Sequence, residues 1–597
     1  MFKDTFDKNT ILGLLLIVAM VVGYFFFNKS RLENMPKEVP AAAVDSTTKI
    51  QTNTVVSTDT TSKKVAVVDT NTVSNAPNKQ LKLKNNLVEL EISSLGAQIN
   101  NAVLFKHKTY NEQNVTLLSK ENTTWNYQFN TTNGIVNTSK LSFSVISETD
   151  SSLDLEASNG TKVSYVLTPN SYVLKQKWTL PNLNKTASPT LNVTTQMNHS
   201  ELNLQRERQY SSVYFLKSGE DVVSSLDKNK NEEKEELTPM NWVAFGQQFF
   251  NTSIVPKGGF TKGKMTTFYM ENDLNYVKKY SANLTLAPQE SYEITYFIGP
   301  SEYKLLKKQG GNLDLIVPLS QDFILFRWMK IFNIYLIIPL FDFLSKFISS
   351  YGIIILIMTL IIKLVLMPLS FKMYRSGVAM KILKPELDAL KKKYGDDQQK
   401  YAQEQMKLYN EVGVNPLGAG CLPMLLQMPI LFAMFNFFPS SIELRHQPFL
   451  WAKDLSTFDS IATLPFTIPF YGDHISLFAL LMSITQIATT VYSQRLQPSS
   501  PQADQMKMMA YIMPVMFLFM FNKFPAALTF YYLLQNLFSI FQQWFVTKFM
   551  IDENKVKEEM ALARKSPKKK GAFQQKMQDL MEQAEAQKKM QQNNTKK

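Results

Sequence analysis

One apolar segment, residues 352–369, contains a lysine and constrains the fold more than any other feature of the chain. Its sequence, GIIILIMTLIIKLVLMPL, is long enough to cross a lipid bilayer. Eleven residues precede Lys363 within the segment and six follow it. A lysine in the apolar part of a bilayer costs roughly 2.5–3.5 kcal/mol, so its ammonium group usually faces a polar cavity. The alternative is a lysine near a helix end whose head group reaches the membrane surface.

Further apolar segments predict a protein that crosses the membrane six times. Residues 11–27 are apolar and have no small-residue cleavage site close behind them, which favours a retained anchor over a signal peptide. Residues 319–348 are apolar but interrupted by charges, which is typical of an interfacial helix. The other five spans are predicted at 351–371, 421–438, 475–492, 508–522 and 526–546.

The distribution of basic residues predicts the orientation. The loop 372–415 holds nine lysines and arginines, whereas the loop 441–474 holds only Arg445 and Lys453. The tail after residue 548 is also strongly basic. Because basic loops stay in the cytoplasm, we expect both termini inside and the region between the first two spans outside.

The region 79–318 has the pattern of a large antiparallel β-sandwich. Apolar residues alternate with polar ones in several short runs, which is typical of half-buried strands. Three such runs carry Leu141, Phe143 and Val145; Val163, Tyr165 and Leu167; and Tyr292, Ile294, Tyr296 and Ile298. The preceding segment, 29–78, is rich in Thr, Ser, Val and Asn and reads as a flexible linker.

The basic loop 372–415 is predicted to form a helical hairpin. Asp396 or Asp397 is placed to cap its second helix. One face of the first helix carries Leu383, Leu387, Leu390 and Tyr394.

Composition argues against several kinds of chemistry. The chain has one cysteine, Cys421, and four scattered histidines, so a disulfide within the chain is excluded and a His/Cys metal site is unexpected. No GxxxxGK[ST] phosphate loop occurs in the sequence. We expect no cofactor and no enzymatic activity.

Four segments resemble the YidC family of membrane protein insertases. They are NPLGAGCLPMLLQMPILFAMF from Asn415, KxxxMPL at 363–369, KFPAALTFYYLLQNLFSIFQQ at 523–543 and LKLKNNLVELEISSLGAQINNAVLF at 81–105. The resemblance extends over nearly the whole chain and includes the basic hairpin and tail.

The resemblance implies a complete architecture. We expect a multi-domain membrane protein of the bacterial inner membrane, with six α-helical spans and a periplasmic antiparallel β-sandwich. The predicted parts are an anchor at 1–28, a linker at 29–78, a periplasmic domain at 79–318, a five-helix insertase core at 319–550 and a basic cytoplasmic tail at 551–597.

The resemblance also implies a function and its partners. Members of the family insert and fold membrane proteins, alone or with the Sec translocon, through a polar groove that carries one positive residue. That residue is usually an arginine, and Lys363 occupies the matching position. An arginine stays charged under any condition, whereas a lysine keeps its charge only where the groove is hydrated.

The candidate residues of the polar groove follow from the resemblance together with the residue pattern. Thr359 lies one helical turn from Lys363, and a glutamine within a span is expected to face the bundle interior. Flexible methionines suit a surface that accepts many helices, although ordinary packing explains most of them equally well. The predicted groove residues are Lys363, Thr359, Gln427, Gln535, Tyr532, Met428, Met434 and Met513, with Tyr532 chosen by resemblance.

The basic tail predicts contacts with phosphate groups. Such runs bind phosphate backbones or anionic lipid, without recognising a specific nucleic-acid sequence. The resemblance implies that the tail helps to dock ribosomes; the alternative is that the basic residues only hold the tail inside. The candidate contacts are Arg564, Lys565, Lys568, Lys569 and Lys570.

Two other functions fit parts of the pattern. A small-solute transporter usually shows repeated halves, and we find no internal repeat. An envelope scaffold whose β-domain does the binding leaves the charged span and the basic hairpin unexplained. An insertase accounts for both the charged span and the basic hairpin, while the function of the β-domain stays unassigned.

Overall fold

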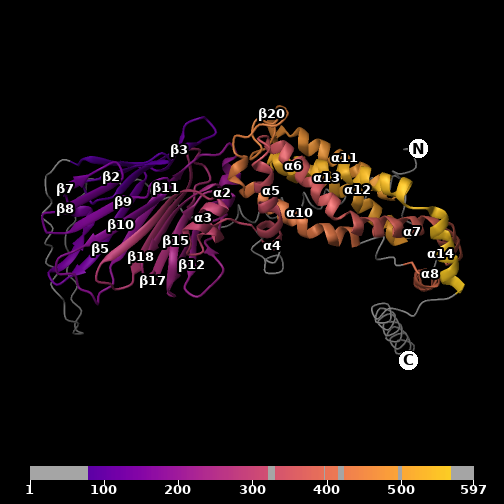
Figure 1. The fold of residues 1–597 in the computed structure, drawn as a ribbon, viewed down its shortest axis with the longest axis horizontal. Helices are drawn as coiled ribbons and strands as arrows, with labels where there is room; N and C mark the ends of the chain where they lie inside the picture. The colour runs from indigo at the N-terminus through magenta and orange to yellow at the C-terminus, as the bar shows by residue number, and fades with distance from the viewer. Residues whose placement is uncertain (1–77, 320–329, 395–396, 415–421, 495–500, 566–597) are drawn as a thin grey trace, which may run out of the picture. The chain divides into compact units, whose positions relative to one another are not determined.

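A computed structural model describes residues 78–319, 330–394, 397–414, 422–494 and 501–565 of the chain (Figure 1). The predicted anchor at 1–28 and all but the last residue of the predicted linker lie outside these described residues. Within them, strands fill the region up to residue 300, and helices dominate the region after residue 330.

The strand-rich region forms two antiparallel sheets. The smaller has the order β1-β2-β3-β4; the larger has the order β6-β5-β11-β18-β17-β15-β16-β19-β10-β9-β8-β7, with β12, β13 and β14 paired beside it. The strands are β1 (Gln80–Lys84), β2 (Val88–Ser93), β3 (Ile99–Lys108), β4 (Asn114–Leu118), β5 (Thr123–Thr131), β6 (Gly134–Asn137), β7 (Phe143–Glu148), β8 (Ser152–Ala157), β9 (Lys162–Leu167), β10 (Val173–Thr179), β11 (Thr190–Asn198), β12 (Ser212–Lys217), β13 (Ser224–Ser225), β14 (Glu232–Glu236), β15 (Met240–Gly246), β16 (Phe250–Pro256), β17 (Phe260–Tyr269), β18 (Tyr276–Leu286) and β19 (Tyr292–Pro300). Short helices α2 (Leu204–Tyr210) and α3 (Tyr303–Gln309) accompany them. The structure confirms the predicted antiparallel architecture.

Alternating burial explains most of these strands. In β9 and β19 the apolar residues of the predicted runs are all buried. In β7, Phe143 is buried, but Val145 is 39% exposed, so the predicted inward position of Val145 is wrong. The reason is that β7 is the last strand in the sheet order, and its pairing with β8 shifts register just after Val145.

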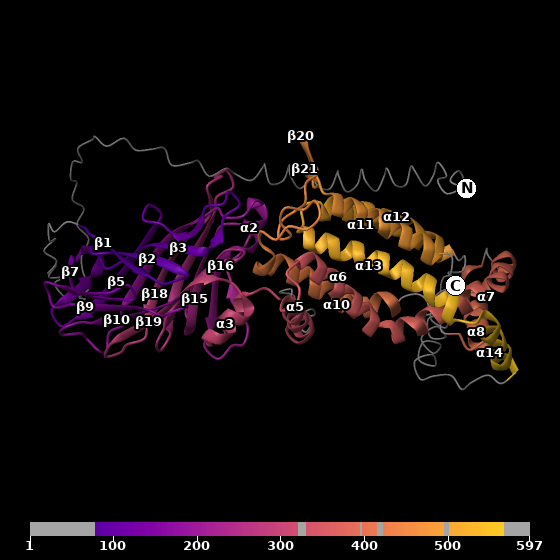
Figure 2. The same ribbon diagram turned by 45° about the horizontal axis from the view of Figure 1, so that its top comes forward.

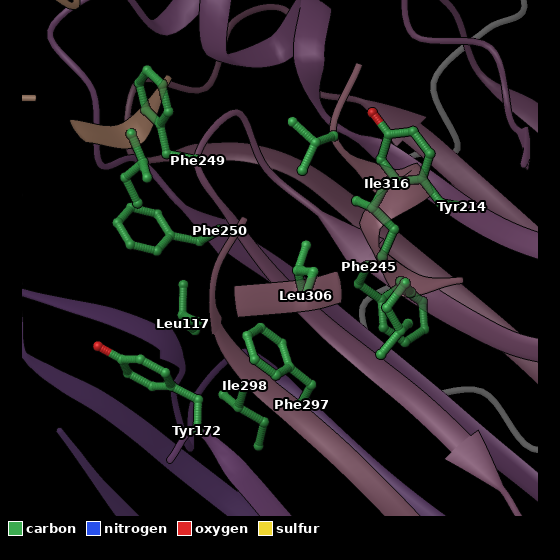
Figure 3. Packing of buried hydrophobic residues seen from close by; sticks show 14 of the residues in the cluster. Leu117, Tyr172, Tyr214, Phe245, Phe249, Phe250, Phe297, Ile298, Leu306 and Ile316 are labelled. Carbon is green, nitrogen blue, oxygen red and sulfur yellow. The ribbon is translucent and has the colours of Figure 1, made fainter. Parts of the chain in front are cut away.

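Aromatic side chains fill much of the β-region core. Trp178 is fully buried, with its ring centroid 5.5 Å from that of Phe129. Figure 3 shows another part of this core, which includes Tyr172 and Phe297. Their rings pack edge to face, with their centroids 6.2 Å apart. Such pairs contribute about 0.5–1.5 kcal/mol each beyond the burial of their area.

In the helical region, helices cover most of each apolar run. Its helices are α4 (Lys330–Phe332), a π-helical turn (Asn333–Ile337), α5 (Ile338–Ser345), α6 (Tyr351–Val365), α7 (Met367–Tyr394), α8 (Gln398–Glu411), α10 (Leu422–Ser440), α11 (Leu477–Gln494), α12 (Pro501–Phe521), α13 (Ala526–Phe545), a second π-helical turn (Val546–Met550) and α14 (Glu553–Lys565). Helix α13 packs against α11, α6 and α10, and α11 also packs against α12 (Figure 2).

The predicted span at 351–371 is a bent pair of helices. Helix α6 ends at Val365, and α7 begins at Met367 with its axis turned by 63°. Pro368 explains the break, because it has no N–H and its ring clashes with the carbonyl of the residue four positions earlier. By length and hydropathy, this pair together is long enough to cross a membrane, and no single helix among the described residues passes the same test.

Helices α7, α8 and α14 share a small apolar core. Leu383 and Leu387 are fully buried in it, and Val412 from the end of α8 and Met560 from α14 pack beside them. Asp397 caps α8 by accepting a hydrogen bond from the backbone N–H of Lys400 at 3.0 Å. Asp397 is thus one of the two expected caps. The expected apolar face of α7 is buried at Leu383 and Leu387 and half-buried at Leu390 and Tyr394.

The loop after α10 contains a hairpin that the sequence pattern did not indicate. Strands β20 (Ala462–Ile468) and β21 (Gly472–Ile475) pair antiparallel, with an irregular register. Most of β20 is exposed, so the alternation of apolar and polar residues that marks a half-buried strand is missing there.

Candidate substrate groove

Lys363 lies in the last turn of α6, and its side chain is buried where α6 meets α13. The residue is 6% exposed. Its Nζ donates a hydrogen bond to Ser539 Oγ at 2.6 Å, and that hydroxyl donates in turn to the backbone oxygen of Gln535 at 2.6 Å. An ammonium group carries three donors. Within the described parts of the chain, Ser539 provides a partner for one of them.

Two glutamines of α13 lie on either side of Ser539. Gln542 Nε2 donates to the backbone oxygen of Lys363 at 3.5 Å, a long contact. The side-chain oxygens of Gln535 and Gln542 are both buried, and neither has a hydrogen-bond partner among the described residues. The spacings of four and three residues place Gln535, Ser539 and Gln542 on one face of α13. We refer to Lys363, Gln535, Ser539 and Gln542 as the polar cluster.

Thr359 is fully buried on α6. Its hydroxyl donates to the backbone oxygen of Ile355 at 2.6 Å, so its proton is used within the helix. The predicted groove role of Thr359 stays a prediction.

Tyr532 connects α13 to α10. Its hydroxyl donates to the backbone oxygen of Leu431 at 3.2 Å, while the ring of neighbouring Tyr531 packs against Phe438 at 5.7 Å. The two tyrosines therefore have different surroundings, as expected for adjacent residues on a helix.

The remaining candidates are spread over α10 and α12. Gln427 and Met428 are half-buried on α10, and Met434 is fully buried there. Met513 on α12 is 40% exposed. The contacts that the structure gives join Lys363 to α13, so a groove that also includes these four residues stays a prediction.

Sequence reasoning missed Ser539 and Gln542. Both lie at helical spacing from Gln535, which was a candidate, and this spacing was the available signal. What the sequence could not show was which span faces Lys363, because that depends on tertiary packing.

The first helix of the tail docks on the hairpin. Arg564 donates two hydrogen bonds to Glu386, at 2.6 and 2.5 Å, and Lys381 pairs with Glu553 at 2.6 Å. Arg375 pairs with Glu559. Arg564, a predicted phosphate contact, is thus engaged within the protein, while Lys565 is exposed. Lys568, Lys569 and Lys570 lie outside the described residues.

Comparisons with known proteins bear on the whole chain. Residues 343–554 match the family model described as 60Kd inner membrane protein, and residues 80–331 match the one described as YidC periplasmic domain. The membrane protein insertase YidC of Amoebophilus asiaticus (strain 5a2) is 35% identical over 601 residues, covering 96% of this chain and 98% of the relative. The chain belongs to the YidC family.

Similarities to a further relative and to a solved structure were also found. The membrane protein insertase YidC of Parabacteroides distasonis is 33% identical and covers 96% of this chain and 97% of the relative. A crystal structure of an active YidC insertase with its first transmembrane domain resolved is 19% identical, has a TM-score of 0.33, and covers 80% of this chain and 94% of that one. The YidC family is an inner-membrane family with a periplasmic domain, and the sequence assignment to it is confirmed. The number of spans and the cytoplasmic position of the termini stay predictions.

The described residues contain no group of three or more His, Cys, Asp or Glu side chains that could hold a metal ion.

Proposed function

We propose that this protein inserts membrane proteins and that the polar cluster captures the segment that crosses the membrane. The main barrier to crossing is the desolvation of charged side chains and of the backbone. A polar site within the membrane shortens the apolar path. A fixed positive charge there attracts acidic side chains, and this attraction is stronger in a medium of low dielectric constant than in water.

The observation that carries this proposal is a buried ammonium group without a carboxylate partner. Lys363 is 6% exposed, and among the described residues its Nζ contacts only the neutral hydroxyl of Ser539. A buried charge without a counter-ion is costly, and such residues in membrane segments usually serve a function. The two remaining N–H donors of Lys363 suit the two oxygens of a carboxylate.

The partners follow from the same proposal. The substrates are nascent membrane proteins, delivered directly or beside the Sec translocon. The basic tail contacts ribosomes and anionic lipid through phosphate groups, without reading a nucleotide sequence.

Charge substitutions at Lys363 test the proposal. Lys363→Arg keeps the positive charge and should retain insertion. Lys363→Glu replaces attraction of acidic segments by repulsion. It should reduce their insertion by about tenfold or more, which corresponds to a free-energy change of about 1.4 kcal/mol or more. Insertion is measured as protease protection of a short reporter with an acidic translocated segment, in proteoliposomes with the full-length protein.

A matched control separates this effect from general damage. Lys523 is exposed between α12 and α13, so Lys523→Glu makes the same change of charge away from the polar cluster. Normal insertion of the acidic reporter by Lys363→Glu would contradict the proposal, as would equal losses in the two variants.

A further inference from the structure

The polar cluster contains two acceptors that the capture of acidic side chains does not use. Gln535 Oε1 and Gln542 Oε1 are both buried, and neither has a hydrogen-bond donor among the described residues. Buried side-chain acceptors without a partner are uncommon in native proteins, and each one calls for an explanation. An acidic side chain cannot provide it, because an ionised carboxylate has no hydrogen to donate.

The two acceptors belong to residues on either side of Ser539, the partner of the ammonium group. Ser539, which holds Lys363 Nζ at 2.6 Å, is four residues after Gln535 and three before Gln542. At the rise of an α-helix, Gln535 and Gln542 are about 10 Å apart along α13. An extended polypeptide covers this distance in about three residues.

A polypeptide backbone has the complementary groups. Every residue except proline carries one N–H donor and one C=O acceptor, and both need partners away from water. The glutamine oxygens accept from N–H groups, and the spare N–H donors of Lys363 suit a carbonyl oxygen. This recognition does not depend on the side chains of the bound segment.

We propose that Gln535 and Gln542 bind the backbone of the translocated segment by accepting hydrogen bonds from its N–H groups. The inference rests on the proposed function and extends its substrates to neutral polar segments. Lys363 then selects for acidic side chains, while the two glutamines bind any extended chain that has free N–H groups. The competing role for the glutamines is hydrogen bonding between helices.

Three reporters distinguish these roles. All three share one membrane span and differ only in a short translocated segment. In the first reporter this segment contains aspartates, and in the second it contains only glycine and serine. In the third it contains only prolines and sarcosines, so its backbone has no N–H groups. Insertion is measured in proteoliposomes that contain the full-length protein. The test variant is Gln535→Met with Gln542→Met. The control is Gln486→Met, which changes a half-buried glutamine on α11.

The test variant should lose insertion of the glycine–serine reporter by roughly threefold to tenfold per lost hydrogen bond. The test variant should insert the reporter without N–H groups as well as the unmodified protein does. The control variant Gln486→Met should insert all three reporters as the unmodified protein does. No loss with the glycine–serine reporter, or equal losses with all three, would overturn the inference. Where the double variant does not fold, as judged by thermal unfolding, Gln542→Met alone gives the same comparison.

The proposed function is tested separately by Lys363→Glu with the aspartate reporter. If that reporter inserts normally, capture by charge fails whatever the glutamine variants show. If Lys363→Glu fails to insert the aspartate reporter while the glutamine variants insert the glycine–serine reporter normally, only backbone binding is contradicted.

Discussion

Lys363 and Lys278 are both buried lysines, and their partners give them different roles. Lys278 is fully buried in the β-region, where its Nζ donates to the backbone oxygens of Ser211 at 2.6 Å and Lys228 at 2.7 Å. These carbonyls hold the side chain in place, so we interpret Lys278 as structural. Lys363 has one neutral hydroxyl partner among the described residues, which agrees with the role proposed for it in binding a substrate.

The first prediction concerns Lys278 and pH. Burial lowers the pKa of Lys278 to about 7, whereas an unfolded lysine titrates near 10.4. Between these values the unfolded state binds more protons, so the free energy of unfolding should rise with pH by up to about 1.4 kcal/mol per unit. Lys278→Met should remove this rise. The measurement is thermal unfolding of the full protein followed by tryptophan fluorescence between pH 7 and 10.

Lys279→Met is the control, because the neighbouring residue is only half-buried. If Lys278→Met and the unmodified protein show the same pH slope, burial does not shift the titration of Lys278.

At the scale of elements, local patterns predicted the apolar helices and the three runs of alternating residues that became β7, β9 and β19, while tertiary contacts remained hidden. The cap of α8 depends on neighbours in sequence, and Asp397 is one of the two residues predicted for it. The apolar face of α7 was also predicted from local spacing, but its burial depends on α8 and α14. The bend before α7 also had a local signal in Pro368, which an apolar run of spanning length concealed. The exposed edge position of Val145 and the docking of α14 on α7 depend on distant residues and had no local signal.

The second prediction concerns α14. Met560 is 8% exposed in the core shared with α7, whereas Arg564 and Glu386 are nearly half exposed. Met560→Ala should weaken the docking of α14 by about 2 kcal/mol or more, and Arg564→Ala by about 1 kcal/mol or less. Hydrogen exchange of the α14 amides in the full protein measures both. A larger effect of Arg564→Ala would show that charge, rather than apolar burial, holds the helix.

At the scale of the whole molecule, the position of α14 changes how the tail should be divided. Helix α14 (Glu553–Lys565) belongs to the apolar core it shares with α7 and α8, so the separable basic tail begins after it. We predict that removing 566–597 weakens co-sedimentation with ribosomes and leaves post-translational insertion largely intact. Removing 553–597 should also expose the apolar surface of α7 and lower the stability of the hairpin. Unchanged co-sedimentation after the shorter deletion would leave membrane topology as the role of residues 566–597.

The proposed insertion mechanism requires direct attraction between Lys363 and the crossing segment, and reversing both charges tests this attraction most directly. Insertion is measured for reporters with two aspartates or two lysines in the translocated segment, each with the unmodified protein and with Lys363→Glu. We predict that Lys363→Glu inserts the aspartate reporter less than the unmodified protein does and inserts the lysine reporter more. If Lys363→Glu reduces the insertion of both reporters equally, or of neither, the ammonium group of Lys363 does not act by attracting the substrate.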